Sequence, residues 1–427
     1  MILILLPIDI SLPIQATTSP LVGITAFLLV PFMLRKIVVT PLLIAVAFFV
    51  VYIFFHSIFF LVYDMTQYQI EPLRFSSWVR QSAALLTGLA LYLVFRKVFL
   101  SIRYSLLMRS LSIGIVLVLV VSVCTLLWRL MPESIFQQVV IFFRADFLSL
   151  PVLTQPYRLA GLSREPAYFA YYITLIALPL VFAFIEYNGK FRWSILFVVI
   201  FLIGALCLTF SLTGYILLFS MLMLGCILGP SRRNLLRVLL LGICSLALVF
   251  FIVPGNYAQK SIDLFFTGYF EKSESSADRL ASLSPFYAIF SSPIVLGYGL
   301  GSTPFHFYDI VPEPIAEIVT KFQWKEYPSF GSLVARLFTE TGIIGLLFFF
   351  AIGSIAYYEI LRIQRSPYND RCPTARFFHL ALIGTGIAYT TSIGSFAFPY
   401  LWFWLGLIDA HYIQISVSGI NSPYDHS

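Results

Sequence analysis

The sequence predicts an all-α, polytopic membrane protein with 11–12 transmembrane helices, and three observations support that fold class. Of its 427 residues, 59% are hydrophobic and only 11% are charged, with a mean hydropathy of +0.91. A soluble protein of this length needs far more polar surface. Apolar runs recur at about the 20 residues that a helix needs to cross a bilayer core. Every second gap between these runs is short and basic, as in proteins that cross the membrane repeatedly.

The apolar runs define the expected spans, and the first residues of the chain decide their number. Residues 1–14 are apolar but short, and Pro7, Asp9 and Pro13 interrupt them. A weak first span is favoured, because twelve spans keep both termini in the cytoplasm. A re-entrant or interfacial segment, which gives eleven spans, is the alternative. The other expected spans are 20–34, 40–63, 81–100, 108–130, 166–187, 193–210, 212–230, 235–254, 333–358, 376–394 and 397–415.

The basic residues predict which gaps face the cytoplasm. Clusters such as Arg35-Lys36 and Arg232-Arg233 lie in short gaps, which the positive-inside rule assigns to the cytoplasm. Two long gaps, 131–165 and 255–331, then lie together on the opposite side. The net charge of +7 follows from this topology, so it indicates contact with anionic membrane lipids and no nucleic-acid partner. Residues 1–427 are expected to form a single integral membrane domain.

Several classes of chemistry are excluded by what the sequence lacks. The five cysteines lie outside both long loops, which argues against a disulfide framework. No Cys and His spacing suggests zinc, so no metal site is expected. No phosphate-binding glycine-lysine loop, serine nucleophile elbow or His-Glu-x-x-His helix is present, and no cofactor is expected. The amino terminus has no basic region followed by a cleavage site, so a removable signal peptide is not expected.

The first long loop ends with charged residues at the start of a span. Arg158, Arg164 and Glu165 come shortly before that span, and Pro166 favours the first turn of a helix. Guanidinium groups bind phosphate through paired hydrogen bonds, so the two arginines suit a diphosphate head group. Arginines that anchor a span end, with a glutamate at the positive end of a helix, explain the same residues without a ligand.

The second long loop is expected to contain two helices. One, at 261–270, is amphipathic with aromatic residues and suits the membrane interface. The other, at 277–290, has apolar residues at helical spacing and begins at Asp278-Arg279. Arg279 is therefore a second candidate for an anion on the same side of the membrane as the first loop. A solvated arginine beside a helix start is the simpler alternative.

Three further residues are candidates for chemistry near this loop. Arg336 and Glu340 are four residues apart, so they share one face of a helix, one to two turns into a span. Ionisable groups at that depth usually face a cavity or each other. His306 lies among loop aromatics, where a histidine is more often polar surface than a general base.

Four short motifs between residues 150 and 350 resemble, in their order, those of the O-antigen polymerase (Wzy) and O-antigen ligase superfamily. Each motif is weak alone, and the shared order makes the resemblance moderately specific. The motifs are Arg158-x-x-Gly161-x-x-x-Glu165-Pro166, Leu208-Thr209-x-Ser211-x-Thr213-Gly214, Arg279 followed by Pro293 and Gly297-x-Gly299, and Glu340-x-Gly342-x-x-Gly345. Two positions depart from the family: Leu212 replaces an arginine, and Gly331 stands where ligases have a catalytic histidine.

The resemblance implies glycosyl transfer at the periplasmic face of the bacterial inner membrane. A glycan on undecaprenyl diphosphate would be moved onto a hydroxyl of a new lipid-linked repeat unit, forming O-antigen or a related surface polysaccharide. The implied partners are this donor, this acceptor, membrane lipids and a chain-length regulator. The implied site residues are Arg158, Arg164, Arg279 and Arg336 for the diphosphate, Glu165 as the favoured base, and Glu340 and His306 as alternative bases.

Two other functions compete with polymerisation. A flippase or transporter of lipid-linked sugars suits twelve spans, but it predicts charges at mid-membrane depth and inverted repeats with broken helices. The charges here gather near the ends of spans, and the sequence has no evident repeat. An O-antigen ligase is the nearer alternative, and Gly331 argues against it.

Overall fold

The computed structural model confirms the all-α fold class, because every regular element among the described residues is a helix. The expected span at 235–254, most of the span at 20–34, the helix at 261–270 and the segment 1–14 lie outside the described residues. Those residues are 28–29, 37–68, 71–102, 104–131, 133–147, 158–163, 165–181, 193–228, 274–288, 295–323, 330–366 and 375–418.

Four of the described helices are long and apolar enough to cross a membrane, by length and composition. They are α2 (Pro41–Tyr68), α3 (Glu71–Ser101), α4 (Tyr104–Leu130) and α15 (Leu333–Arg365). The remaining helices are α5 (Ile135–Ile141), η1 (Phe142–Phe147), α6 (Pro166–Tyr172), η2 (Ile173–Ala177), α8 (Trp193–Cys207), α9 (Leu212–Leu228), α12 (Glu274–Tyr287), α13 (Thr303–Ile310), α14 (Glu313–Gln323), α16 (Ala375–Thr391) and α17 (Pro399–Ser418).

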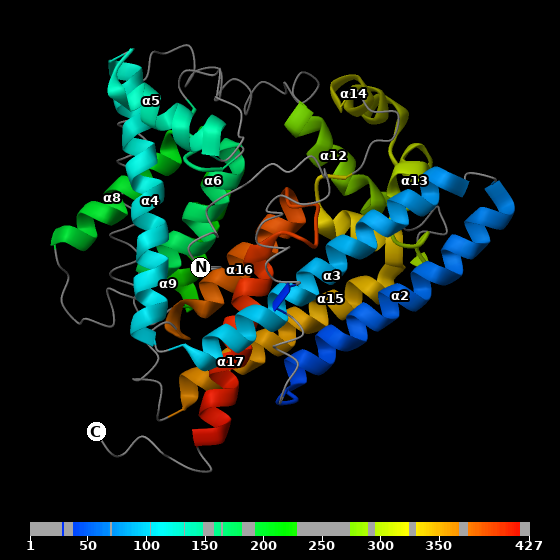
Figure 1. Ribbon diagram of the computed structural model, residues 1–427. Helices are drawn as coiled ribbons and strands as arrows, with labels where there is room; N and C mark the ends of the chain where they lie inside the picture. The colour runs from blue at the N-terminus through cyan, green and yellow to red at the C-terminus, as the bar shows by residue number, and fades with distance from the viewer. Residues whose placement is uncertain are drawn as a thin grey trace.

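Helix α17 lies at the centre of the molecule. It packs along α3 and also contacts α15 and α16, and Figure 1 shows it in red among these helices. Trp402, Phe403 and Trp404 are each at most 1% exposed. Three consecutive large residues point to different sides of a helix, so α17 is covered all round. A helix that is apolar on every side belongs in the interior.

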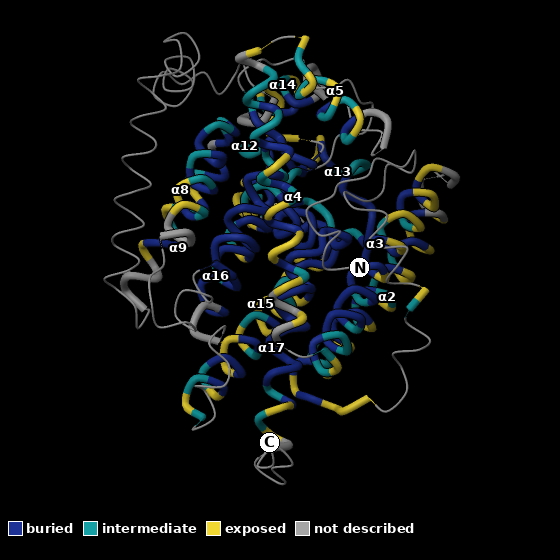
Figure 2. Tube along the Cα trace, turned by 60° about the vertical axis from the view of Figure 1, so that its left-hand side comes forward, coloured by how far each residue is buried: buried dark blue, intermediate teal, exposed yellow. Residues whose placement is uncertain are grey.

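Helix α2 has the opposite pattern, with one buried face and one apolar exposed face. Phe49 and Ile53 are fully buried against the bundle, whereas Phe55 is 73% exposed. Figure 2 shows this alternation of buried and exposed residues along the outer helices. A wide apolar outer face is costly in water, and the lipid chains of a bilayer remove that cost. The exposed face of α2 therefore agrees with the membrane assignment.

A small layer made by α12, α13 and α14 covers one end of α15. Figure 1 shows the three helices together at that end. Phe307, Val319, Phe338 and Ala281 form a second hydrophobic core between the layer and α15. The ring of Phe286 also stacks on Phe338, with centroids 5.4 Å apart. Helix α12 agrees with the helix expected at 277–290, whereas α13 and α14 were not expected.

Helix α3 begins about ten residues before the span expected at 81–100. Its first turns carry Arg74 and Ser77, which hydropathy alone excludes from a span. Both side chains are buried, at 2% and 3% exposure, because they bind backbone carbonyls of the segment 298–301. Bonds inside the protein replace those to water, so polar residues extend the helix.

Candidate functional site

The first two motifs lie against each other. The segment 158–163 docks on the turn at 208–211 that joins α8 to α9. The Leu159 amide donates to the Leu208 carbonyl at 2.8 Å, and Arg158 Nε donates to the Thr209 carbonyl at 3.1 Å. From the other side, Arg144 of η1 donates to the carbonyls of Gly161 and Ser163. Arg158 therefore lies half-buried at the turn between α8 and α9.

The hydroxyl groups of the second motif build this turn. Thr209 Oγ1 donates to the Leu206 carbonyl at 2.7 Å and accepts from the Ser211 amide at 3.2 Å. Ser211 Oγ accepts from the Gly214 amide in the first turn of α9. Side-chain oxygens commonly satisfy backbone amides in this way at turns and helix starts. Thr209 and Ser211 thus have a local structural role, whereas Thr213 contacts other elements.

Arg279 reaches this turn from α12, 66 residues further along the chain. Its Nη2 donates to Thr213 Oγ1 at 2.6 Å. The ring of Tyr171 in α6 is near both groups, because its hydroxyl contacts Thr213 and is within electrostatic reach of Arg279 and Glu165. Three separate segments thus place Arg158, Arg279 and Glu165 near the N-terminal end of α9. We call Arg158, Glu165, Thr213 and Arg279 the hairpin cluster.

Glu165 differs from Glu340, the other acidic candidate, in being exposed. It is the N-cap residue of α6, with extended backbone at φ −127° and ψ 152°, and its side chain forms no capping hydrogen bond. Pro166 occupies the first helical position, as the sequence predicts. The carboxylate therefore lies in solvent at the positive end of a helix. Arg164, the residue before it, lies outside the described residues.

Glu340 is buried in α15, at 1% exposure. Thr303 Oγ1 donates to its Oε1 at 2.8 Å, and Arg336 Nη2 lies 3.3 Å from the same oxygen. Arg336 also donates to the Gly394 carbonyl. The i,i+4 spacing of Arg336 and Glu340 thus produces an ion pair, as expected for one helix face. Both charges are already partnered inside the protein.

The third and fourth motifs also meet. Gly297, Gly299 and Gly301 have positive φ angles, and so does Gly342, where the helical backbone of α15 is interrupted. The Gly299 amide donates to the Glu340 carbonyl at 2.7 Å. A Cβ atom on Gly297 would lie 2.8 Å from that carbonyl oxygen. The glycines are therefore needed for close backbone contact, and we call residues 297–301 the glycine loop.

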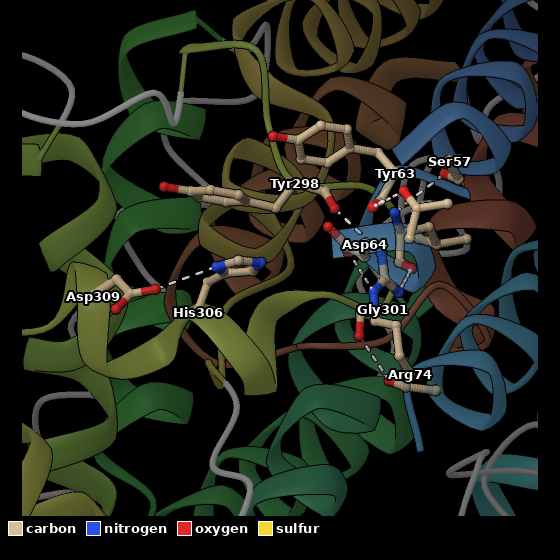
Figure 3. A network of polar contacts seen from close by, with 11 residues as sticks. Ser57, Tyr63, Asp64, Arg74, Tyr298, Gly301, His306 and Asp309 are labelled. Carbon is tan, nitrogen blue, oxygen red and sulfur yellow. Dashed lines mark hydrogen bonds and ion pairs between the residues drawn. The ribbon is translucent and has the colours of Figure 1, made fainter. Parts of the chain in front are cut away.

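His306 lies in α13, immediately after the glycine loop. Its ring stacks on Tyr298 with the centroids 4.0 Å apart and the planes 14° from parallel. Its Nδ1 is 3.2 Å from Asp309 Oδ2, and Figure 3 shows this contact. The imidazole is therefore held between an aromatic ring and a carboxylate that is 68% exposed. Both of these partners, Tyr298 and Asp309, lie outside the hairpin cluster.

The turn between α16 and α17 joins the two halves of the site. Arg336 binds the Gly394 carbonyl in this turn, and Tyr171 packs edge to face on Phe398, with centroids 6.0 Å apart. Arg336 thus contacts this turn directly, and Glu340 is attached to it through Arg336. The hairpin cluster is attached to it through Tyr171. His306 is attached through the glycine loop.

Sequence reasoning missed the polar residues that support this arrangement. Asp64 of α2, Arg74 of α3 and Arg144 of η1 are each at most 8% exposed. Arg74 binds the glycine loop and Asp64, and Arg144 binds the 158–163 segment. A single arginine near the end of a span is usually interpreted as a lipid anchor. The signal available in the sequence was the pair Asp64 and Arg74, with opposite charges on either side of one short gap.

The fold defines a polytopic, all-α membrane protein with two polar clusters, one at the start of α9 and one at the start of α15. Residues 196–350 of this chain match a family model described as O-antigen ligase, which extends from α8 into α15 and includes the second, third and fourth motifs. The match confirms the resemblance to the O-antigen polymerase and ligase superfamily. It supports a polymerase or ligase type of function in a membrane glycan-processing enzyme. No curated protein matches the chain.

Proposed function

We propose that this protein polymerises lipid-linked oligosaccharide repeat units into O-antigen or a related surface polysaccharide. The donor would be a glycan on undecaprenyl diphosphate, and the acceptor a hydroxyl of a new lipid-linked repeat unit. The reaction would occur at the periplasmic face of the inner membrane, with both termini in the cytoplasm. A chain-length regulator is the proposed protein partner, and no nucleic acid is involved.

One observation supports polymerisation over ligation. Gly331, where the superfamily's ligases have a catalytic histidine, lies at the entrance to α15 and has no side chain to accept a proton. A Cβ on Gly394 would lie 3.1 Å from the Gly331 carbonyl oxygen, so the α16–α17 turn packs closely on the backbone at this position. The described part of the chain therefore offers no base at this position.

The hairpin cluster supports a role in leaving-group departure. Cleavage of the bond between sugar and diphosphate leaves negative charge on the diphosphate, and fixed donors stabilise such charge in a site that excludes water. Arg158 and Arg279 are held near each other through Thr209 and Thr213. We assign the diphosphate to these two residues and to Arg164. Arg336 is a weaker candidate, because Glu340 and the Gly394 carbonyl already bind it.

The acceptor hydroxyl needs a group that takes its proton as the new glycosidic bond forms. A general base must be accessible to that hydroxyl. Glu165 is the exposed carboxylate of the hairpin cluster, so we assign the base to it. Glu340 is buried and paired with Arg336, which favours a role in positioning. His306, stacked on Tyr298, is better suited to contact a sugar ring than to reach the diphosphate.

Deletion of the gene, followed by electrophoresis of the surface glycans of the source cells, tests this proposal. We expect loss of the long-chain ladder while a single repeat unit remains attached to its acceptor lipid, because ligation does not need the polymerase. Loss of every repeat unit, including the first, would support a ligase or flippase instead. An unchanged pattern for all surface glycans would contradict both assignments.

A further inference from the structure

Arg74 is a buried arginine whose three guanidinium nitrogens all have partners. Its side chain is 2% exposed. Nε donates to Asp64 Oδ2 at 2.9 Å, Nη1 to the Leu300 carbonyl at 2.8 Å, and Nη2 to the Tyr298 carbonyl at 3.2 Å. Two of its three bonds therefore end on the backbone of the glycine loop. Figure 3 shows Arg74 between Asp64 and this loop.

Other side chains of the same helices bind the same loop. Ser77 Oγ donates to the Gly301 carbonyl at 2.8 Å, and Ser57 Oγ accepts from the Leu300 amide at 3.2 Å. His56 Nε2 lies 2.7 Å from the Leu296 carbonyl. The α2–α3 hairpin thus satisfies backbone groups of the loop that the loop cannot satisfy by itself. Each of these bonds joins residues more than 220 positions apart in the chain.

The other side of the loop binds α15 around Glu340. The Tyr298 amide donates to the Thr339 carbonyl at 3.0 Å, and the Gly299 amide to the Glu340 carbonyl at 2.7 Å. Thr303, two residues after the loop, donates to the Glu340 carboxylate. The Tyr298 carbonyl, which accepts from Arg74, and the Gly299 amide, which donates to Glu340, therefore belong to the same peptide group.

Space at the loop is also closely limited. A Cβ atom on Gly299 would lie 2.8 Å from Phe60 Cβ and 3.0 Å from Arg74 Nη2. A Cβ atom on Gly301 would lie 2.8 Å from the Ser77 carbonyl oxygen. Because the loop backbone touches α2 and α3 directly, a shift of these helices moves the loop as well.

We propose that Asp64 and Arg74, which lie outside residues 196–350, form a positioning pair that fixes the glycine loop against Glu340. This inference rests on the proposed function and extends it to a part of the chain that the family model does not cover. Arginine suits the role because its planar fork reaches Asp64 and two carbonyls at once, which a lysine ammonium cannot do with the same geometry. Asp64 holds the fork in the required orientation through a charge-assisted bond.

A contribution to folding stability alone does not explain a buried ion pair of this kind, because its desolvation costs free energy. Removing two charges from water is expensive, and apolar residues of similar volume often stabilise a fold equally well. A positioning role does explain the pair, since displacing catalytic groups by about 1 Å can lower a rate about 100-fold. The two explanations differ in their effect on turnover, so kinetics can separate them.

The test uses the full chain in lipid nanodiscs with undecaprenyl-diphosphate-linked glycan extracted from the source cells. Arg74→Lys and Asp64→Asn are compared with Arg80→Lys, which changes an exposed arginine on the same helix. For Arg74→Lys we expect kcat to fall about 10- to 100-fold while KM for the lipid-linked glycan changes less than twofold. Asp64→Asn should give a smaller loss of kcat, and Arg80→Lys should match the wild type.

Hydrogen–deuterium exchange gives a second readout that does not depend on activity. The amides of Tyr298, Gly299 and Leu300 donate to Thr339, Glu340 and Ser57, so a loop that Arg74 holds should protect them. We expect faster exchange in the peptide 295–302 for Arg74→Lys and unchanged exchange for Arg80→Lys. If Arg74→Lys does not fold, Ser77→Ala replaces it, with about a threefold loss of kcat and the same direction in exchange.

The outcomes separate this inference from the proposed function. If the wild type is active and the turnover of Arg74→Lys is within twofold of the wild-type value, the positioning role alone is overturned. Unchanged exchange in Arg74→Lys would overturn it as well. A fall in kcat that comes with an equal rise in KM would also overturn it, because it would indicate binding. A wild type that transfers no glycan would overturn the proposed function, whereas the exchange result would still show whether Arg74 holds the loop.

Discussion

At the residue scale, the two glutamates of the site have opposite environments. Glu165 is exposed at the start of α6, whereas Glu340 is 1% exposed and receives bonds from Thr303 and Arg336. A carboxylate that must accept a proton from a substrate needs access to it, and a carboxylate that is paired and buried holds structure instead. The same residue type thus has two environments in this protein, and they suit different purposes.

Glu165→Gln should slow polymer formation without affecting the fold. The side chain is exposed and forms no capping bond to α6, so its loss leaves few contacts unmade. General-base catalysis contributes about 100-fold or more, which sets the expected loss of rate. The measurement is glycan transfer by the purified protein, beside thermal unfolding. Glu317→Gln, which changes an exposed residue of α14, is the control, and a wild-type rate for Glu165→Gln would make the base assignment wrong.

Arg279→Ala should abolish most activity, and Arg279→Lys should give an intermediate rate. The guanidinium binds Thr213 at 2.6 Å, which fixes it in the hairpin cluster, and a guanidinium carries five N–H donors. Loss of a fixed donor to developing charge costs about 100- to 1,000-fold in kcat. A lysine retains the charge but not the paired geometry. The measurement is the rate of glycan transfer by each variant. Arg80→Ala, which changes an exposed arginine, is the control. Retained activity in Arg279→Ala would remove this residue from the site.

Glu340→Gln should destabilise the protein, because it leaves Arg336 buried without a charge partner. Breaking one side of a buried ion pair costs about 3–5 kcal/mol, whereas replacing both sides with apolar residues is often close to neutral. Arg336→Met combined with Glu340→Leu should therefore recover most of the lost stability. Denaturation in detergent measures both variants. The double variant should still be inactive if Glu340 positions the site, and equal stability of the two variants would contradict the pairing argument.

At the element scale, helix α15 is one long apolar run in the sequence but has a break near its start. Gly342 has φ 66° and ψ −167°, which is not helical, and its neighbours pack on the glycine loop. Helix α15 contacts α12 and α13, and Glu340, two residues before the break, accepts a bond from Thr303 of α13. One glycine thus separates the turns of α15 that carry Arg336 and Glu340 from the rest of the helix.

Gly342→Ala and Gly353→Ala form a matched pair within α15. A Cβ atom on Gly342 would lie 2.7 Å from the Leu296 carbonyl oxygen, at a φ that L-residues rarely adopt, whereas one on Gly353 meets no atom within 4 Å. Gly342→Ala should therefore lower stability by more than about 1 kcal/mol. Gly353→Ala should raise it by about 0.5–1 kcal/mol through helix propensity. Thermal unfolding compares them, and equal effects would contradict a required break.

The sequence predicted helices better than it predicted the contacts between them. Hydropathy located α4, α9, α16 and α17 to within a few residues, because length and apolarity decide a span. It missed α13 and α14, since glycines and prolines around them indicated a loop. It also missed the bonds from Arg74 to residues 298–300, because partners more than 200 residues apart leave no local pattern.

At the scale of the whole molecule, charged residues hold both ends of the bundle together. Far from the glycine loop in the chain, Arg96 of α3 pairs with Asp409 of α17, with Nε 2.6 Å from Oδ2, and both are at most 5% exposed. Tyr92 donates to the same carboxylate. Glu359 of α15 is fully buried and within electrostatic reach of Asp409 and Arg96. One arginine therefore serves two carboxylates on two different helices.

Because one arginine lies near two carboxylates, we expect replacement of each acid to change the stability by a different amount. Asp409→Asn should destabilise the protein by about 3–5 kcal/mol, because it breaks the direct pair with Arg96 and weakens the bond from Tyr92. Glu359→Gln should change stability by less than about 1 kcal/mol, since a neutral amide there removes repulsion from Asp409 and leaves the Arg96 pair intact. Both variants should keep their kinetic constants when folded, because neither acid touches the proposed site. Unfolding in detergent tests the order, and a larger loss for Glu359→Gln would mean that Glu359 is the main partner of Arg96.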